Sequence, residues 1–491
     1  MLKIRHPRSV YVAGNWIKVA KVEPVINPAN EEVLFEAPVS GVEVADAAIA
    51  AARDAFDNGP WPRMSQHERN AFLARFIDAI EARRSEVIDL IIAESGATRQ
   101  GTEHFSYTTA IQHSRSFLEF ALRPAITPLP VETVPNAFGT TTLAAASMVR
   151  EPIGVVSAIT PFNAPLLLNL AKLIPALAVG CTIILKPSPF TPMEALILGE
   201  FADEAGLPKG VFSVVTGDVE IGTMLTSDPR IDLVSFTGSD KVGALIQSQA
   251  APHIKRVLLE LGGKSAMIVR EDADLDAAAQ AGLFSIVFQC GQGCGLHTRH
   301  LVHKSLRQAY VEKVRALLPT IQIGDPNDLQ TTMGPLINAQ AIQRTEEYVE
   351  LGLQQGGRLI MGGNRPPQFK SGFFFEPTLF DNVDNNFRIA REEIFGPIGV
   401  VIEFEDDDDA IAIANDSEYG LSGGIFSKDV GRAYEMALRL RTGNVILNGG
   451  SGHVSSHHPF GGYKRSGIGR EYGVEGLNEF TEIKTITFKG A

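Results

Sequence analysis

One cysteine of the chain stands in a setting that suits nucleophilic chemistry. Cys294 lies in the run Gly291-Gln292-Gly293-Cys294-Gly295, where a predicted helix runs out into glycines. A thiolate is a strong nucleophile, and flanking glycines let a substrate carbonyl approach the sulfur while leaving backbone N–H groups free to bind an oxyanion. The alternative is a small buried side chain, which most free cysteines are and which we expect of Cys290. Both interpretations of Cys294 are open on these residues alone.

A second group of reactive side chains follows the predicted strands. Asn163 supplies an amide, Lys186 an ammonium and Glu260 a carboxylate, each after an apolar, β-rich run. In a parallel sheet the carboxyl ends of the strands meet at one edge, where ligands bind. The segments expected at this edge are Thr160-Pro161-Phe162-Asn163, Lys186-Pro187-Ser188-Pro189, Thr216-Gly217, Phe236-Thr237-Gly238-Ser239 and Glu260-Leu261-Gly262-Gly263. They therefore predict a single site.

A helix that begins at this edge has the features of a phosphate site. Gly238 and Ser239 open a predicted helix toward Gly243, where free backbone N–H groups and the helix dipole favour an anion. A plain N-cap explains the same two residues. Because the usual Gly-x-Gly-x-x-Gly fingerprint is missing, a dinucleotide would have to bind in a variant mode.

Two clusters of polar residues resemble metal sites, but the spacing of the residues argues against metal binding in either cluster. His297, His300 and His303 cross from the cysteine loop into a predicted strand, whose alternate faces would separate them. The acidic run 406–409 is interpreted as a solvated helix start, since adjacent acids cannot all face one ion. We therefore predict no metal.

The elements that position these residues alternate between strand and helix. Short apolar strands separated by helices predict an α/β fold with a parallel sheet covered on both faces. The strands are expected at 154–159, 182–185, 211–215, 231–235, 256–259, 266–269, 300–303 and 399–404. The helices are expected at 44–56, 69–94, 166–179, 193–205, 221–226, 242–250, 275–288, 306–317 and 339–354. A proline-rich stretch at 124–146 and a tail strand at 481–488 suit an extended excursion that pairs with another chain.

Composition bounds the class of protein. With 491 residues the chain is long enough for two or three domains. Its formal net charge of −13 disfavours binding to nucleic acid or to an anionic membrane. Three cysteines do not make a disulfide scaffold, so we expect a reducing, cytoplasmic compartment. The most apolar window, 166–185, is interrupted by polar residues and a proline, and the first ten residues carry no signal peptide.

Nearly the whole chain resembles the NAD(P)-dependent aldehyde dehydrogenase superfamily, of the non-acylating, hydrolytic type. The resemblance rests on the order and spacing of several motifs, and Cys294 follows Glu260 by the family's usual 34 positions. The motifs are Pro161-Phe162-Asn163, Lys186-Pro187-Ser188, Phe236-Thr237-Gly238-Ser239, Glu260-Leu261-Gly262-Gly263-Lys264, Gly291-Gln292-Gly293-Cys294, 392–397, 419–422 and 459–471.

The resemblance implies the catalytic roles. Cys294 would attack an aldehyde as a thiolate and form a thiohemiacetal, whose oxyanion the Asn163 amide and the Cys294 backbone N–H would hold. After hydride transfer to the nicotinamide leaves a thioester, Glu260 would act as the general base that activates water. The acid would then be released.

The resemblance also implies a cofactor site. Lys186 would bind the adenosine ribose, Ser239 the pyrophosphate and Glu393 the nicotinamide ribose, with Phe395 packed near the nicotinamide. The full set expected to bind the cofactor is Thr160, Pro161, Phe162, Lys186, Ser188, Pro189, Gly217, Phe236, Gly238, Ser239, Gly243, Leu261, Glu393 and Phe395. For Glu393 a helix-start carboxylate, and for Phe395 plain core packing, are the structural alternatives.

One departure from the family concerns the cofactor. Many NAD-preferring relatives carry a glutamate three residues after the lysine, where its carboxylate repels the 2′-phosphate of NADP. This chain has Pro189 there. We expect NAD as the commoner choice in the family, with NADP possible because the repelling charge is missing.

The expected substrate channel differs from that of many relatives in the size of its wall side chains, and none of these side chains is charged. Its walls would be Ala164, Leu168, Ala171, Phe288, Gly293, Gly295, Val454 and Phe460. Several of these are small and none is charged, whereas a charged aldehyde needs a counter-charge or an aromatic cage. We therefore predict a medium to bulky uncharged aldehyde that is aromatic, long-chain or terpenoid.

Rival functions and the domain layout complete these expectations. The alternatives are a semialdehyde dehydrogenase, including a CoA-acylating one, and a catalytically silent dinucleotide-binding structural protein. The resemblance implies a Rossmann-like cofactor domain at 1–125 and 152–261 and an α/β catalytic domain at 262–466. A small β oligomerisation arm at 126–151 and 478–491 would join a homodimer or homotetramer.

Overall fold

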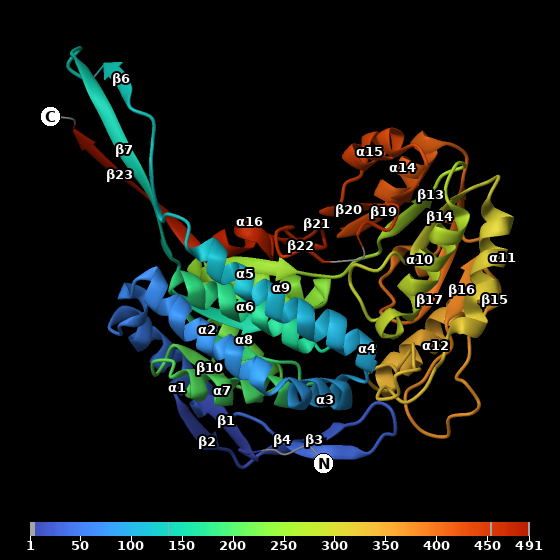
Figure 1. Cartoon of the computed structure of the whole chain (residues 1–491), viewed down its shortest axis with the longest axis horizontal. Helices are drawn as coiled ribbons and strands as arrows, with labels where there is room; N and C mark the ends of the chain where they lie inside the picture. Colours follow the sequence, from blue (N-terminus) through green and yellow to red (C-terminus); the bar gives the residue numbers. More distant parts are fainter. Residues whose placement is uncertain (1–4, 136, 452–453, 490–491) are drawn as a thin grey trace.

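The chain forms two sheet-containing bodies and a projecting β-arm (Figure 1). The computed structural model describes residues 5–135, 137–451 and 454–489. Small parts of the predicted cofactor domain (1–4), catalytic domain (452–453) and arm (136, 490–491) lie outside this range. The arrangement of parallel sheets and helices confirms the predicted α/β class.

The first body is built around an eight-stranded sheet in the order β2-β1-β10-β9-β8-β11-β12-β22. Its five central strands are parallel, and the strands at both edges are antiparallel. The strands are β1 (Ser9–Val12), β2 (Asn15–Lys18), β8 (Val155–Ile159), β9 (Thr182–Lys186), β10 (Phe212–Val214), β11 (Leu233–Thr237), β12 (Arg256–Glu260) and β22 (Gly467–Ile468). The strand order reverses between β8 and β11, and ligands bind α/β sheets beside such a switch point.

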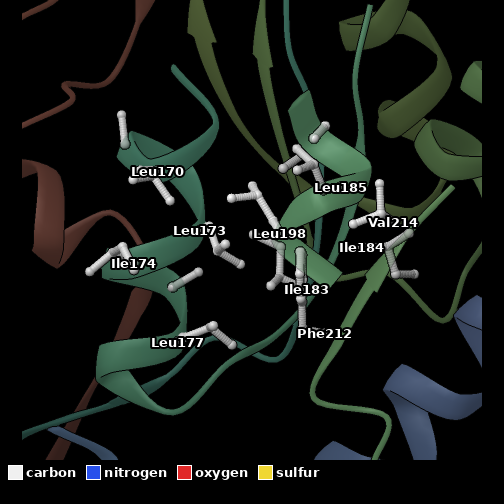
Figure 2. Packing of buried hydrophobic residues seen from close by; sticks show 14 of the residues in the cluster. Leu170, Leu173, Ile174, Leu177, Ile183, Ile184, Leu185, Leu198, Phe212 and Val214 are labelled. Atoms are coloured by element: carbon white, nitrogen blue, oxygen red, sulfur yellow. The ribbon is translucent and has the colours of Figure 1, made fainter. Parts of the chain in front are cut away.

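Continuous apolar strands explain why this sheet is covered on both faces. Every residue of β9 is buried, and so are four of the five residues of β8. Figure 2 shows leucines of α6 and Leu198 of α7 packed beside Ile183 of β9 and Phe212 of β10. The helices of this body are α1 (Val42–Asp57), α2 (Gln66–Ala82), α3 (Arg84–Ser95), α4 (Arg99–Gly101), a π-helix (Thr102–Thr108), α5 (Thr109–Ala121), α6 (Pro165–Val179), α7 (Met193–Ala205), α8 (Val219–Ser227), α9 (Asp240–Ala250) and α16 (Gly473–Asn478).

The second body has its own sheet and its own hydrophobic core. The sheet runs β15-β16-β17-β14-β13-β19-β20 and is parallel except between β15 and β16. Its strands are β13 (Ala266–Val269), β14 (Arg299–His303), β15 (Arg358–Met361), β16 (Thr378–Asp381), β17 (Ile398–Phe404), β19 (Ser422–Phe426) and β20 (Asn444–Leu447). Its helices are α10 (Leu275–Val287), α11 (Arg307–Leu317), α12 (Ala339–Gln354), α13 (Arg388–Arg391), α14 (Asp407–Asn415) and α15 (Val430–Arg439).

Smaller strands complete the fold. The arm contains β5 (Ile126–Pro128), β6 (Glu132–Pro135), β7 (Thr141–Pro152) and β23 (Thr481–Lys489). Two further antiparallel pairs join β3 (Val22–Ile26) to β4 (Val33–Pro38) and β18 (Tyr419–Gly420) to β21 (Tyr463–Lys464). In the described part of the chain, no helix is long and apolar enough to cross a membrane.

Several sequence predictions differ from the structure. Strands β1 to β4 were missed, because the first segment was interpreted as helical only. The predicted helix 69–94 is two helices that meet at Arg83, whose φ of −112° and ψ of 28° interrupt the helix. The tail strand β23 pairs with β7 of its own chain, and its other edge has no partner strand among the described residues. Strand β11 begins and ends two residues later than predicted, so Phe236 lies within it.

Candidate active site

The cysteine loop begins where helix α10 ends at Val287. Three consecutive residues, Gln289, Cys290 and Gly291, have φ of 48°, 56° and 73°, and this left-handed run turns the chain away from the helix. Cys290 is fully buried in the second core, as predicted. Cys294 lies further along the loop and is only partly buried. The loop therefore presents one cysteine and hides the other.

The connection between β12 and β13 packs directly against this loop. A Cβ atom added to Gly263 would overlap the carbonyl oxygen of Cys294, and one added to Gly262 would overlap the carboxylate of Glu393. The backbone N–H of Gly263 donates a hydrogen bond to Oε1 of Glu393 at 2.9 Å. Two glycines thus let the cysteine loop and Glu393 approach the end of β12 closely.

Glu260 is the last residue of β12 and is almost completely buried. Within the described residues, neither of its carboxylate oxygens has a hydrogen-bond partner. Burial raises its pKa well above the usual value, and the nearby Glu471 raises it further, while Lys172 and Arg470 act in the opposite direction. A buried, unpaired carboxyl with a raised pKa is a typical catalytic acid or base.

The thiol of Cys294 is held mainly in its protonated form. Burial raises its pKa to about 12, and the charges of Glu393 and Glu260 add to this effect. A nucleophilic attack therefore requires a base to remove the thiol proton, or a bound ligand that changes this environment.

Asn163 lies beside the cysteine loop, as the sequence predicted. Its Nδ2 atom donates to the carbonyl oxygen of Gln292 at 3.0 Å, two residues before Cys294. The side-chain amide carries two N–H groups, so one remains for another acceptor. Gln292 is itself fixed by a hydrogen bond from the Ile337 N–H to its Oε1 at 3.0 Å. This arrangement holds an amide donor next to the thiol.

The predicted cofactor residues lie around the switch point of the first sheet. Lys186 ends β9, and burial lowers its pKa to about 8, which the charge of Asp218 partly offsets. Ser239 is the N-cap of α9 and its hydroxyl accepts from the Val242 N–H at 3.3 Å. The N-cap alternative therefore applies to this hydroxyl. Gly243 is close-packed, since an added Cβ would lie 2.6 Å from Cδ2 of Leu261.

The remaining cofactor candidates surround this edge. Phe162 forms edge-to-face ring pairs with Phe395 at 6.0 Å and with Phe190 at 5.9 Å between centroids. Ser188 is buried and its hydroxyl accepts from the Phe190 N–H at 3.3 Å, while Pro189 is exposed. The other predicted positions follow β8 (Thr160, Pro161), precede α8 (Gly217), lie near the end of β11 (Phe236) or link β11 to α9 (Gly238).

The predicted channel residues divide between three parts of the chain. Ala164, Leu168 and Ala171 lie at the start of α6, and Phe288, Gly293 and Gly295 belong to the cysteine loop. Val454 and Phe460 come from the segment after β20. The Phe460 ring comes within 3.8 Å of the position of a Cβ on Gly295, next to the thiol. Phe460 therefore lies beside the residue that follows Cys294.

Sequence reasoning missed aromatic residues that extend this wall. The Phe288 ring packs against Phe105 at 5.2 Å and Phe284 at 4.9 Å between centroids. Tyr472 packs against Phe460 at 6.4 Å. Phe105 comes from the π-helix and Tyr472 from the residue before α16, so no local sequence pattern connects them with Cys294.

Charged and apolar residues near the site were also missed. Lys172 of α6 forms a buried ion pair with Glu471, 299 positions away in the sequence. Lys264 is buried, and its Nζ has no hydrogen-bond partner among the described residues. Val242 and Leu245 of α9 are exposed apolar side chains just beyond Ser239. The sequence offered one signal for Val242 and Leu245, because both are apolar residues in the helix that begins at the predicted phosphate site.

The three histidines have different hydrogen-bond neighbours. Nε2 of His297 lies 3.2 Å from the Ser422 hydroxyl, and Nδ1 of His300 lies 2.9 Å from the Tyr310 hydroxyl. Nδ1 of His303 lies 2.7 Å from the Ser305 hydroxyl. Each ring therefore has a different neighbour, and the described residues contain no group of three or more His, Cys, Asp or Glu side chains placed to hold a metal ion.

Several known proteins are similar to this chain in sequence and in fold over nearly their full length. The model of the Aldehyde dehydrogenase family matches residues 16–486. A 3-succinoylsemialdehyde-pyridine dehydrogenase from a Pseudomonas species is 40% identical over 98% of this chain and 99% of its own length. A geranial dehydrogenase from Castellaniella defragrans is 38% identical over 98% of each chain. The crystal structure of a Mycobacterium tuberculosis aldehyde dehydrogenase complexed with NAD+ has a TM-score of 0.92, with 41% identity and 98% coverage of both chains.

Proposed function

The chain belongs to the aldehyde dehydrogenase family, and we propose that it oxidises a medium-sized to bulky uncharged aldehyde to the carboxylic acid with NAD+. The substrate class that we propose is aromatic, long-chain or terpenoid. One observation carries this proposal. Alanine, leucine, valine, phenylalanine and glycine make up the expected channel, and the aromatic rings of Phe105 and Phe284 extend it without adding charge. Such a wall would remove water from a charged substituent without offering an opposite charge or a hydrogen bond in its place.

The catalytic roles proposed for this chain follow from the geometry around the sulfur. Once a base has removed the thiol proton, Cys294 Sγ attacks the aldehyde carbon, and the free N–H of the Asn163 amide and the Cys294 backbone N–H stabilise the oxyanion that forms. The contact between Gly263 and the Cys294 carbonyl fixes the loop during this step. When bound, NAD+ supplies the hydride acceptor that turns the thiohemiacetal into a thioester.

Glu260 acts as the general base for hydrolysis in this proposal. Its oxygens are not tied to protein donors among the described residues, so they are available to a water molecule. Its raised pKa makes it a stronger base than an exposed carboxylate. Water attacks the thioester carbon as Glu260 takes its proton, and the Cys294 thiolate leaves.

The residues present fit a dinucleotide. Lys186 is a buried ammonium at the switch point, suited to ribose hydroxyls, and the N-terminus of α9 at Ser239 suits the pyrophosphate. The exposed Val242 and Leu245 offer an apolar surface for the adenine base. Glu393, held by the Gly263 N–H, binds the nicotinamide ribose. NADP use is proposed as a secondary activity, because the exposed Pro189 carries no charge to repel a 2′-phosphate.

The names of two relatives agree with a large organic aldehyde. One specifies a pyridine-bearing semialdehyde and the other geranial. The first of these also favours a second candidate function, oxidation of a semialdehyde. We further propose that the arm joins this chain to other copies in a dimer or tetramer.

An aldehyde panel tests the function. Initial rates of reduced-nicotinamide formation are measured for benzaldehyde, octanal and succinic semialdehyde, with saturating NAD+ and then with NADP+. We expect kcat/KM for benzaldehyde and octanal to exceed that for succinic semialdehyde by at least about tenfold, as expected for burying an uncompensated charge.

Two cysteine variants control this experiment. Cys294→Ala removes the proposed nucleophile and should abolish aldehyde oxidation, whereas Cys290→Ala, four positions earlier, should retain it. A higher kcat/KM for the semialdehyde would reject the uncharged substrate class. Activity that survives in Cys294→Ala would reject the mechanism, and a rate that depends on added CoA would indicate acyl transfer to a thiol.

A further inference from the structure

Tyr472 has a backbone conformation that side chains rarely adopt. Its φ of 59° and ψ of 171° fall in a region used almost only by glycine. The neighbouring backbone holds it there, because Glu471 exchanges two hydrogen bonds of 2.7 Å with Phe460 and the Gly473 N–H donates to Ser456 at 2.9 Å. A non-glycine residue in such a conformation persists when its surroundings determine it, and such residues cluster at functional sites.

The ring of Tyr472 is buried between two elements of the first body. Its edge-to-face partner is His113 of α5, with 4.7 Å between ring centroids. His113 in turn contacts the channel segment, because its Nε2 lies 2.9 Å from the carbonyl oxygen of Val454. The other ring neighbour of Tyr472 is Phe460 at 6.4 Å. Tyr472 therefore packs against Phe460 of the expected channel wall and against His113, which in turn contacts the backbone of Val454.

The ring neighbour of Tyr472 reaches the cysteine loop. This neighbour, Phe460, approaches Gly295 beside the thiol. The charges of Glu260 and Cys294 are both among those that raise the pKa of Tyr472, after burial and Glu471. Helix α16, which Tyr472 precedes, packs against α6, the helix that carries Ala171. The small side chains of Ala164 and Ala171 leave this end of the channel to be shaped by a residue from elsewhere.

We infer that Tyr472 is a specificity-determining residue, whose ring forms with Phe460 the wall that contacts the organic group of the bound aldehyde. Aromatic rings prefer offset or edge-to-face partners, so this wall favours a planar aryl group over a saturated chain. The inference rests on the proposed function and narrows it to aromatic aldehydes. The ring, rather than the hydroxyl, provides the selectivity.

Three substitutions at Tyr472 distinguish the effect of the ring from the effects of the hydroxyl and of the backbone conformation. Tyr472→Leu keeps an apolar side chain but removes the ring, Tyr472→Phe removes only the hydroxyl, and Tyr472→Gly removes the ring while suiting the observed φ and ψ. The measured quantity is the ratio of kcat/KM for benzaldehyde to kcat/KM for octanal. Tyr434→Leu on α15, where the tyrosine is exposed, is the matched control.

We expect Tyr472→Leu and Tyr472→Gly to lower this ratio by about tenfold, the size of effect that one shape-dependent contact produces in a pocket. Tyr472→Phe and Tyr434→Leu should change it by less than about twofold, and the KM for NAD+ should stay constant in all variants. These results would support the inference, because a merely structural role would reduce both aldehydes equally.

An unchanged ratio in Tyr472→Leu and Tyr472→Gly, or an equal loss for both aldehydes, would overturn the inference. If Tyr472→Leu does not fold, Tyr472→Gly decides the question, since its backbone is unstrained in this conformation. The parent enzyme separates this failure from failure of the proposed function. Rapid oxidation of both aldehydes with an unmoved ratio rejects only the role of Tyr472, whereas an inactive parent enzyme rejects the function itself.

Discussion

At the scale of single residues, the proposed site combines a protonated thiol with a buried carboxyl group. The thiol of Cys294 has a pKa raised to about 12, and Glu260 has a raised pKa for the same main reason, which is burial. Each carboxylate near the sulfur makes the thiolate less favourable. The same burial that weakens the nucleophile at rest gives Glu260 the basicity to activate it or a water molecule.

The pH dependence of the rate follows from these two groups. Both pKa values lie above their usual values, so each reactive anion becomes more populated as pH rises. Below about pH 12 the thiolate fraction grows about tenfold per unit. We therefore expect kcat/KM to rise continuously from pH 6 to pH 9, measured with benzaldehyde and NAD+. A rate that falls over this interval would contradict the assignment.

Removing the base tests the second half of the mechanism. Glu260→Gln keeps the size of the side chain but cannot accept a proton, so kcat should fall by about 10²–10⁴. If Glu260 acts on water, a rapid burst of reduced nicotinamide should persist before the slow steady state, as seen by stopped-flow absorbance. Gln66, on α2, donates a hydrogen bond to the Ala178 carbonyl at the C-terminal end of α6 and is no part of the proposed machinery, so Gln66→Glu should leave both phases unchanged. Loss of the burst would show that Glu260 acts before hydride transfer.

At the scale of elements, the site depends on glycines that let two loops touch. The turn after β12 meets the cysteine loop at Gly263 and meets Glu393 at Gly262. Neither contact tolerates a Cβ atom without displacement of backbone or of a buried carboxylate. The chemistry of Cys294 is therefore positioned by the end of a strand in the other sheet.

Gly263→Ala tests this packing. The added methyl group must push the Cys294 carbonyl away, and a shift of about 1 Å in a reacting group can cost about 10²-fold in rate. We expect kcat to fall by about that factor, measured in the standard oxidation assay. Gly431→Ala on the exposed face of α15 should leave kcat unchanged. Equal activity of the two variants would show that the contact does not position the thiol.

At the scale of the whole molecule, the arm leaves apolar side chains uncovered. Ile483, Ile486 and Phe488 of β23 are exposed, and β23 is an edge strand of its sheet. An uncovered apolar edge is a surface for association. Because β23 already pairs with β7 of its own chain, the contact with another copy would use the outer edge or the face of the arm.

Light scattering at micromolar concentration tests this association. We expect a mass of two or four chains for the parent protein. Ile486→Lys should shift the mass toward a monomer, because it places a charge on the apolar face of the arm. Val430→Lys, on the exposed start of α15, should leave the mass unchanged. A monomeric parent protein would contradict the proposal.

Local sequence patterns predicted much of the fold and part of the candidate site. Strands such as β8 and β9 are buried on both faces, so their unbroken apolar runs revealed them, and the motif spacing led to Cys294, Glu260 and Asn163. Strands β2, β3 and β4 were missed because their burial is mixed, so they carry no such run, and β1 was missed because its buried run is only four residues long. Strand limits also shifted, since pairing with a neighbour extends a strand beyond its apolar residues.

The sequence by itself therefore determined the family and the α/β class, and it indicated the residues that we propose perform the chemistry. Only the tertiary structure decided the protonation of those residues, the contact of Gly263 with the cysteine loop, and the neighbours of Tyr472. The pair formed by Lys172 and Glu471 joins positions 299 residues apart, and His113 meets Tyr472 across a similar separation. Burial and charge interactions depend on distances in space, and a chain's local pattern does not encode which distant segments will meet.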